Sequence, residues 1–269
     1  MAVMQAELAR DLAMALDPVL LMHQAGLTPD PWQRELLSSD AHRKILLCAR
    51  QVGKSTVVAA KALHVALYQP GSLTLIVTPS ERQSRETLAK VVAFYTALGE
   101  PVSREYESTL HLTLANGSRI LALPGSAQTV RGLSGVALLI LDEAGWIPDA
   151  LYHTVLPMLA VSKGQLVLLS TPAGKRGFLH QEYTEGGPDW QRIMITADQC
   201  PRISPEFLAE QRRRMPAGRY AAEYDCEFGE LEGAVFGYDD IHAALSGDVV
   251  PLWSTPATIE EEDYAPSLW

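Results

Sequence analysis

The feature that most constrains the fold is a short apolar run that leads through a glycine-containing turn into a helical segment. Residues 43–49 read as a buried strand, and residues 55–68 follow with the periodicity of a helix. The pattern then repeats, because residues 73–78 are strand-like and residues 80–98 form a long amphipathic stretch. Such alternation predicts a parallel sheet covered by helices.

Later segments extend this sheet and add one hairpin. Three apolar runs have the length of buried strands, at 136–141, 165–170 and 191–196. A helical segment at 150–159 separates the first two runs. Between residues 108 and 123, apolar and polar residues alternate around Asn116-Gly117, which indicates a β-hairpin. We therefore expect an α/β fold with a mainly parallel central sheet of at least four strands, flanked by helices and carrying a β-hairpin insertion.

The chain is long enough for one large α/β domain with small additions. We predict a helical N-terminal segment at 1–28 and a core at 29–200. Capped helical stretches at 201–245 predict a small C-terminal lid and linker. Prolines and an acidic run mark residues 246–269, which we expect to form a flexible tail.

Composition says more about where the protein is located than about what it binds. The formal net charge of −10 counts against a surface that coats nucleic acid by bulk electrostatics, although a local basic face could still contact phosphates. The three cysteines are too far apart in sequence for a CxxC pair or a disulfide framework. No apolar run reaches the roughly 18 residues of a membrane span, and the charged N-terminus is not a secretory signal. We expect a soluble cytoplasmic protein with no membrane partner.

The turn between the first strand and its helix reads Cys-Ala-Arg-Gln-Val-Gly-Lys-Ser from Cys48 to Ser55. In that context, loop N–H groups and the helix N-terminus can hold the β- and γ-phosphates of ATP, with Lys54 neutralising charge and Ser55 coordinating Mg²⁺. Cys48 replaces the usual first glycine, so an ordinary helix start is the alternative for this segment alone. The candidate nucleotide-binding residues here are Arg50, Gln51, Val52, Gly53, Lys54, Ser55 and Thr56.

A second segment favours nucleotide hydrolysis. Asp142 and Glu143 end the apolar run 136–141, in the form of a Walker B element. Asp142 would hold the Mg²⁺ shell, and Glu143 would orient and deprotonate the attacking water. Strand ends also carry acidic residues for ordinary capping reasons, but the phosphate-binding loop upstream makes hydrolysis of ATP the stronger interpretation.

Other candidates have a structural alternative of similar weight. Ser170, Thr171 and Pro172 end a strand where hydroxyl groups could couple the γ-phosphate to a neighbouring segment, or could simply form a turn. Gln33 could present its amide to an adenine edge, or could be an exposed helix-cap residue. A glycine-rich loop carries Arg131, which could reach outward or be merely solvated.

With these residues in place, the sequence resembles the ATPase domain of the large terminase subunit, the motor that packages DNA into tailed-phage procapsids. The resemblance spans roughly residues 29–240. That family commonly carries Arg-Gln before Gly-Lys-Ser/Thr and tolerates a non-glycine first position, as at Arg50-Gln51 and Cys48 here. Further matches are Pro31-Trp32-Gln33 to its adenine motif, Asp142-Glu143-Ala144 to its Walker B, Ser170 to Gly174 to its coupling motif, and 220–236 to the stretch before its nuclease.

The resemblance implies a P-loop NTPase of the ASCE type that hydrolyses ATP with Mg²⁺ and translocates double-stranded DNA. It makes Arg50 a sensor in the nucleotide's own subunit and Arg131 an arginine finger for a neighbour. It also implies a portal protein and a small terminase subunit as partners, and a homo-oligomeric ring when assembled, with a monomer in isolation left open. The expected location is a bacterial host cell, transiently at the portal vertex. Too few residues follow Phe236 for the family's RNase H-type nuclease, so we expect it to be absent or truncated.

Two alternatives come from other classes. A helicase-type translocase shares the glutamine, the Asp-Glu-Ala and the Ser-Thr-Pro elements, but it needs a second motor domain for which the chain has no room after Asp225. A nucleotide-gated assembly protein would bind ATP without turnover. The intact set of Lys54, Asp142 and Glu143 argues against that second alternative.

Overall fold

The computed structural model describes residues 2–125, 130, 132–229 and 244, and the structural statements below concern these residues. The chain divides into two compact units, Met1–Leu231 and Glu232–Trp269, and the fold described here is that of the first unit. Arg131 and the predicted tail 246–269 lie outside the described residues. No described helix is both long and apolar enough to cross a membrane.

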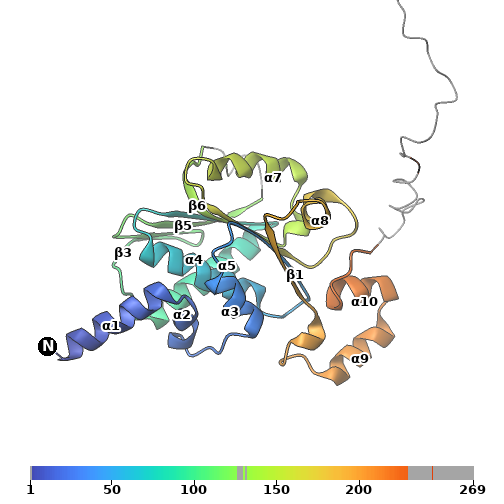
Figure 1. The fold of residues 1–269 in the computed structure, drawn as a ribbon, viewed down its shortest axis with the longest axis horizontal. Helices are drawn as coiled ribbons and strands as arrows, with labels where there is room; N and C mark the ends of the chain where they lie inside the picture. The colour runs from blue at the N-terminus through green and yellow to red at the C-terminus, as the bar shows by residue number, and fades with distance from the viewer. Residues whose placement is uncertain (1, 126–129, 131, 230–243, 245–269) are drawn as a thin grey trace, which may run out of the picture. The chain divides into compact units, whose positions relative to one another are not determined.

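The centre of the first unit is an eight-stranded sheet in the order β3-β4-β5-β2-β6-β7-β1-β8 (Figure 1). The strands from β5 to β8 in this order pair in parallel, whereas β3, β4 and β5 pair antiparallel at one edge. This confirms the predicted α/β architecture with a mainly parallel sheet. The strands are β1 Arg43–Cys48, β2 Leu73–Thr78, β3 Arg104–Glu107, β4 His111–Leu114, β5 Arg119–Pro124, β6 Val136–Asp142, β7 Gln165–Ser170 and β8 Trp190–Ile195.

Helices cover both faces of the sheet. Figure 1 shows α3, α4 and α5 on one side and α7 and α8 on the other. The central strands are consequently buried on both faces: β2 is buried at every position, and β6 is apolar up to its last residue. The helices are α1 Ala2–Leu16, α2 Val19–Gln24, α3 Pro31–Ser38, α4 Lys54–Tyr68, α5 Glu81–Ala97, α7 Asp149–Val155, α8 Gly177–Thr184, α9 Pro205–Arg214 and α10 Ala217–Tyr224, with 3₁₀ turns η1 Ala144–Trp146, η2 Leu156–Leu159 and η3 Ala197–Gln199.

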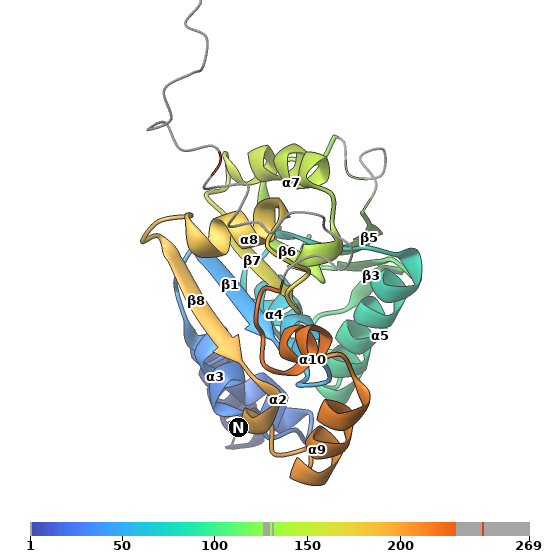
Figure 2. The ribbon, with the colours of Figure 1, turned by 90° about the vertical axis from the view of Figure 1, so that its right-hand side faces the viewer.

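Helix starts follow the local sequence closely. The Ser80 hydroxyl accepts a hydrogen bond from the Gln83 N–H at the start of α5, and the Ser204 hydroxyl does the same for the Phe207 N–H at the start of α9. Helix α9 also has proline in its first position, where the missing N–H costs nothing. Helices α9 and α10, at the lower right of Figure 2, form the helical pair that the sequence predicted as a lid.

The structure contains more sheet than the minimum predicted. The Asn116-Gly117 hairpin joins β4 to β5 as expected, and β5 also pairs in parallel with β2, so the hairpin continues the main sheet. Strand β3 extends that edge and was not predicted, because its sequence Arg-Glu-Tyr-Glu is exposed throughout and lacks an apolar period. Helix α8 was also missed.

Candidate active site

The loop between β1 and α4 lies at the C-terminal edge of the parallel strands, where open α/β sheets bind ligands. Gly53 precedes α4 with φ of 97°, a left-handed conformation that favours glycine. A Cβ atom at Gly53 would also lie 2.9 Å from Gln33 Nε2. The N–H groups of Lys54 and Ser55 open the first turn of α4 and have no intrahelical acceptor. This loop therefore provides N–H donors for an anion.

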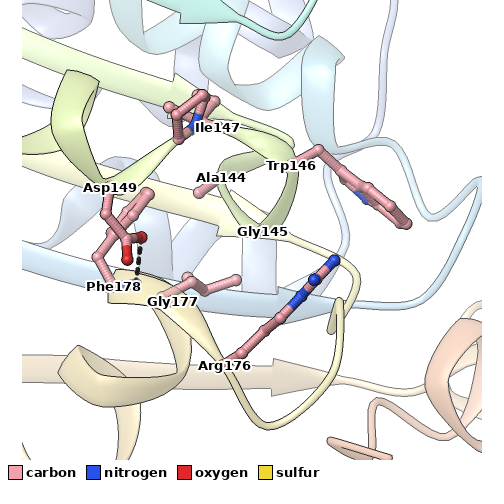
Figure 3. Close-up of a pocket in the computed structure, with 10 residues that line it drawn as sticks. Ala144, Gly145, Trp146, Ile147, Asp149, Arg176, Gly177 and Phe178 are labelled. Carbon is pink, nitrogen blue, oxygen red and sulfur yellow. Dashed lines mark hydrogen bonds between the residues drawn. The ribbon is translucent and has the colours of Figure 1, made fainter. Parts of the chain in front are cut away.

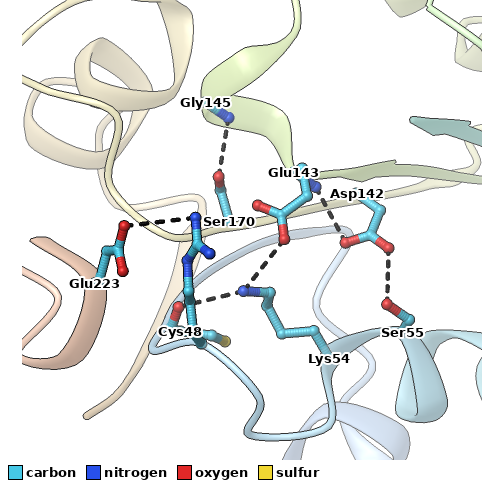
Figure 4. A network of polar contacts seen from close by, with 9 residues as sticks. Cys48, Lys54, Ser55, Asp142, Glu143, Gly145, Ser170 and Glu223 are labelled. Carbon is cyan, nitrogen blue, oxygen red and sulfur yellow. Dashed lines mark hydrogen bonds and ion pairs between the residues drawn. The ribbon is translucent and has the colours of Figure 1, made fainter. Parts of the chain in front are cut away.

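Four predicted site residues meet beside this loop (Figure 4). The Ser55 hydroxyl donates to Asp142 Oδ2 at 3.2 Å. Lys54 Nζ lies 3.4 Å from Glu143 Oε1 and 3.5 Å from the Cys48 carbonyl oxygen. The Glu143 N–H donates to Asp142 Oδ1 at 3.0 Å. The loop and the end of β6 thus place a cation, a hydroxyl group and two carboxylates together.

The two carboxylates occupy different environments. Asp142 is only 4% exposed. Burial, together with the Glu143 charge, raises the pKa of Asp142 to about 6, against the opposing effects of Lys54 and Ser55. Glu143 is partly exposed and has φ of 56°, an uncommon conformation for a residue with a side chain. Strained backbone of this kind occurs at functional sites, and here it brings Glu143 within reach of Lys54.

The oxygen atoms of Ser55 and Asp142 fit Mg²⁺, which takes oxygen ligands and is commonly bound by one or two protein groups together with substrate phosphates. Within the described part of the chain, no group of three or more His, Cys, Asp or Glu residues could hold a metal ion. A dedicated protein cage for a metal is therefore not present among these residues. A two-ligand site completed by phosphate oxygens is the arrangement that the donor set supports.

The predicted coupling residues lie directly beside the Walker B turn. The Ser170 hydroxyl accepts a hydrogen bond from the Gly145 N–H at 3.2 Å. Ser170, Thr171 and Pro172 are buried. This contact joins the end of β7 to the turn that follows Glu143 (Figure 4). Transmission of hydrolysis through these residues stays a prediction.

Arg50 is directed toward α10. Its backbone N–H donates to the Glu223 carbonyl oxygen at 3.0 Å, and its guanidinium group lies 3.5 Å from Glu223 Oε1. Arg219 also contacts that carboxylate, with Nε at 3.1 Å. The helical pair therefore touches the phosphate-binding loop directly. The sensor role of Arg50 stays a prediction, as do nucleotide contacts by Gln51, Val52 and Thr56.

Gln33 is 4% exposed and uses its amide within the protein. Its Oε1 accepts a hydrogen bond from the Asp30 N–H at 2.9 Å, which caps α3. The amide nitrogen faces Gly53. The described structure thus places Gln33 against the phosphate-binding loop, and its contact with adenine stays a prediction.

Cys48 ends β1 and is completely buried. Burial raises the pKa of the Cys48 thiol well above its usual range, more than the nearby Lys54 lowers it. Burial therefore disfavours the reactive thiolate that a helix N-terminus would favour. Cys48 serves as an apolar residue where other loops of this kind have glycine.

Two features of the site had no sequence signal. Arg202, from the turn before α9, contacts both Asp30 and the Val52 carbonyl oxygen. A hollow of about 440 Å³ lies between η1 and α8, next to the Walker B turn. Figure 3 shows the side chains of Trp146 and Arg176 extending to the same side of this hollow. Both features join segments that are distant in the sequence.

Comparison with known proteins identifies relatives of the same kind. The large terminase subunit of Escherichia phage T5 is 27% identical over 229 residues, which is 80% of this chain and 51% of that protein. The large terminase ATPase domain of Thermus phage P74-26 superposes with a TM-score of 0.67 and 25% identity over 77% of this chain and 96% of that one. The large terminase of bacteriophage HK97 gives a TM-score of 0.60 and 19% identity, over 74% of this chain and 50% of that one. The chain thus spans about half the length of the T5 protein.

Fold and site together define the class. The strand that ends in Ser170 lies between the strand before the phosphate-binding loop and the strand that ends in Asp142, as in a P-loop NTPase of the ASCE type. A family model for the N-terminal part of the T4-like terminase large subunit matches residues 45–243. This chain belongs to that terminase large-subunit family.

Proposed function

We propose that this chain is the ATPase motor domain of a phage large terminase subunit, which hydrolyses ATP with Mg²⁺ and drives double-stranded DNA into a procapsid. The observation that carries the proposal is the cluster of Lys54, Ser55, Asp142 and Glu143 at the end of the parallel strands. The relative from Thermus phage P74-26, which is named as an ATPase domain, supports nucleotide chemistry at this cluster.

The proposed partners follow from family membership rather than from contacts in this chain. They are double-stranded DNA, the portal protein of the procapsid, a small terminase subunit and further copies of the chain in a ring. The proposed location is the cytoplasm of a bacterial host, with transient binding at the portal vertex.

The site residues have distinct roles in this mechanism. The N–H groups at the start of α4 bind phosphate oxygens, and Lys54 neutralises their charge. Phosphate oxygens compete with Glu143 for Lys54, whose Nζ lies 3.4 Å from Glu143 Oε1. Glu143 then orients a water molecule and accepts its proton. Bound through Ser55 and Asp142, Mg²⁺ would neutralise charge that develops on the transferred phosphoryl group.

The first test replaces Glu143 with glutamine. The amide still hydrogen-bonds water but cannot accept its proton, so Glu143→Gln should keep ATP affinity while the rate of phosphate release falls by about 10²–10⁴-fold. Lys54→Ala should instead weaken ATP binding itself, measured by titration with a fluorescent ATP analogue. Glu86→Gln, on the exposed surface of α5, is the matched control and should leave both quantities unchanged.

The outcomes separate the proposal from its alternatives. A phosphate-release rate near wild type in Glu143→Gln would remove Glu143 from the role of general base. A wild-type chain that binds ATP but releases no phosphate, with or without double-stranded DNA, would favour a nucleotide-gated assembly protein. The proposal requires that the wild type releases phosphate and that Glu143→Gln loses this activity with ATP binding intact, whereas Glu86→Gln keeps both.

A further inference from the structure

Arg202 connects its own turn before α9 with two other segments at the nucleotide site, the start of α3 and the phosphate-binding loop. It lies in the turn between η3 and α9, at the base of the helical pair. Its Nη1 donates to Asp30 Oδ1 at 2.9 Å and its Nη2 to Asp30 Oδ2 at 2.6 Å. The same Nη2 donates to the Val52 carbonyl oxygen at 2.9 Å. One guanidinium group therefore holds the start of α3 and the phosphate-binding loop together.

The contact with Val52 has a consequence for phosphate binding. A peptide unit is planar and trans, so the carbonyl oxygen of one residue and the N–H of the next point to opposite sides of the chain. By holding the Val52 carbonyl oxygen on its own side, Arg202 directs the Gly53 N–H away from itself. That N–H immediately precedes the donors of Lys54 and Ser55 at the start of α4. Rotation of the peptide would remove a donor from the phosphate side of the loop.

The contact with Asp30 fixes the other side of the site. The Asp30 N–H donates to Gln33 Oε1 at 2.9 Å, and the Gln33 amide nitrogen faces Gly53. Asp30 is nearly buried, with 10% of its side chain exposed, so its two oxygen atoms depend on Arg202 for much of their hydrogen bonding. A bidentate pair of this kind requires the planar fork of arginine, which lysine cannot reproduce.

We propose that Arg202 is a positioning residue of the nucleotide site, which orients the Gly53 N–H toward phosphate and holds the Gln33 segment against the loop. This inference rests on the proposed function, because it presumes that ATP binds at the loop. With 51% of its side chain exposed, Arg202 is not a core residue, and its contribution lies in orientation.

The test compares nucleotide affinity among matched variants in the absence of DNA. Arg202→Gln and Arg202→Lys should each raise the Kd for a fluorescent ATP analogue about 10-fold or more, since both lose the fork. Phosphate release at saturating ATP should change less than about threefold, because the lost contacts stabilise bound ATP and the transition state to the same extent. Asp30→Asn should weaken binding similarly, and the Arg202→Gln/Asp30→Asn double variant should be no worse than either single variant. Arg213→Gln, an arginine on α9, is the control and should bind as wild type.

Each outcome decides between the possibilities. If the wild-type chain fails to bind the analogue, the proposed function fails, and this inference fails with it. If the wild type binds the analogue and both Arg202→Gln and Arg202→Lys bind it as tightly as the wild type does, only the role of Arg202 is overturned. Full affinity in Arg202→Lys alone would show that charge suffices and would overturn the orienting role of the fork. Circular dichroism identifies any variant that does not fold, in which case Arg202→Lys and Asp30→Asn decide the question.

Discussion

At the scale of single residues, Gly53 satisfies two requirements at once. Its φ of 97° disfavours any residue with a side chain, and a Cβ atom there would lie 2.9 Å from Gln33 Nε2. The positive φ is a requirement of the local backbone, whereas the lack of space for a Cβ atom depends on how α3 packs against the loop. A substitution at Gly53 should therefore affect both folding and the site.

We expect Gly53→Ala to lower the free energy of unfolding by about 1–2 kcal/mol and to weaken ATP binding, because the loop must move away from Gln33. Gly99→Ala is the matched control. Gly99 has φ of 79° and nothing within 4 Å of an added Cβ, so it should show a similar loss of stability with unchanged ATP affinity. Urea unfolding and analogue titration measure the two quantities. Equal ATP affinity in Gly53→Ala and wild type would refute the effect on the site.

At the scale of elements, the phosphate-binding loop is held by segments from the C-terminal half of the unit. The Ala49 N–H donates to the Ile195 carbonyl oxygen at the end of β8, and the Arg50 N–H donates to the Glu223 carbonyl oxygen in α10. Arg202 adds the contact with Val52. A shift of the helical pair would therefore alter the loop directly, through the backbone hydrogen bond from Arg50 to Glu223.

Strand β1 also carries a buried charge at its other end. Lys44 is fully buried, and Lys44 Nζ donates to the Ala41 carbonyl oxygen and to Gln165 Oε1. Burial, together with the nearby charge of Lys61, lowers the pKa of Lys44 to about 7. An unfolded lysine keeps its proton to far higher pH. Just above pH 7, Lys44 thus keeps its proton in the unfolded chain and loses it in the folded one, so its contribution to stability rises with pH.

The prediction concerns this pH dependence. Between pH 7 and 8.5, Lys44 should contribute about 1–2 kcal/mol to the rise in the free energy of unfolding, and Lys44→Met should lose that contribution. A smaller rise should remain in Lys44→Met, because burial lowers the pKa of Lys61 to about 8. Lys90→Met, on the exposed face of α5, should keep the whole rise. Urea unfolding at the two pH values measures the difference. The window stops at pH 8.5, because buried Cys48 and Cys226 have raised pKa values and reverse the slope at higher pH. An unchanged slope in Lys44→Met would contradict the assignment.

At the scale of the whole molecule, family membership predicts that several copies act together. Arg131, which lies outside the described residues, is predicted to complete the active site of a neighbouring copy. Arginines supplied by a neighbour typically contribute about 10³–10⁵ in rate, so an isolated copy should hydrolyse ATP slowly.

Mixing inactive variants tests this prediction. Phosphate release per copy should rise with protein concentration, and Arg131→Ala should abolish the rise with ATP affinity nearly unchanged. Arg131→Ala and Glu143→Gln should each be inactive alone. Together they should recover partial activity, because some junctions pair an intact Glu143 with an intact Arg131. If sedimentation shows mixed assemblies without recovery, Arg131 acts within its own copy or only shapes its loop.

The sequence predicted most of the fold, and the candidate site residues that it indicated at Lys54, Ser55, Asp142 and Glu143 lie together in the structure. The ranges of β2 and β7 and the start of α5 were predictable, because apolar period, glycine and helix caps act over a few residues. Lys54, Ser55, Asp142 and Glu143 were recognisable as candidates for the same reason, because Lys54 and Ser55 open the helix after the glycine-containing turn and Asp142 and Glu143 lie at the end of a strand. Strand β3 was not predictable, since pairing with β4 and not local pattern stabilises it.

The sequence by itself therefore determined most of the elements and the candidate residues of the phosphate-binding loop, through interactions between near neighbours. Only the tertiary structure decided what surrounds that loop. Arg202 lies 150 residues from Val52 and 172 from Asp30, and it meets both because η3 and α9 pass beside the loop. Strand order likewise brought Ser170 to Gly145 and Ser55 to Asp142. Such contacts depend on how the whole chain packs, which no local pattern encodes.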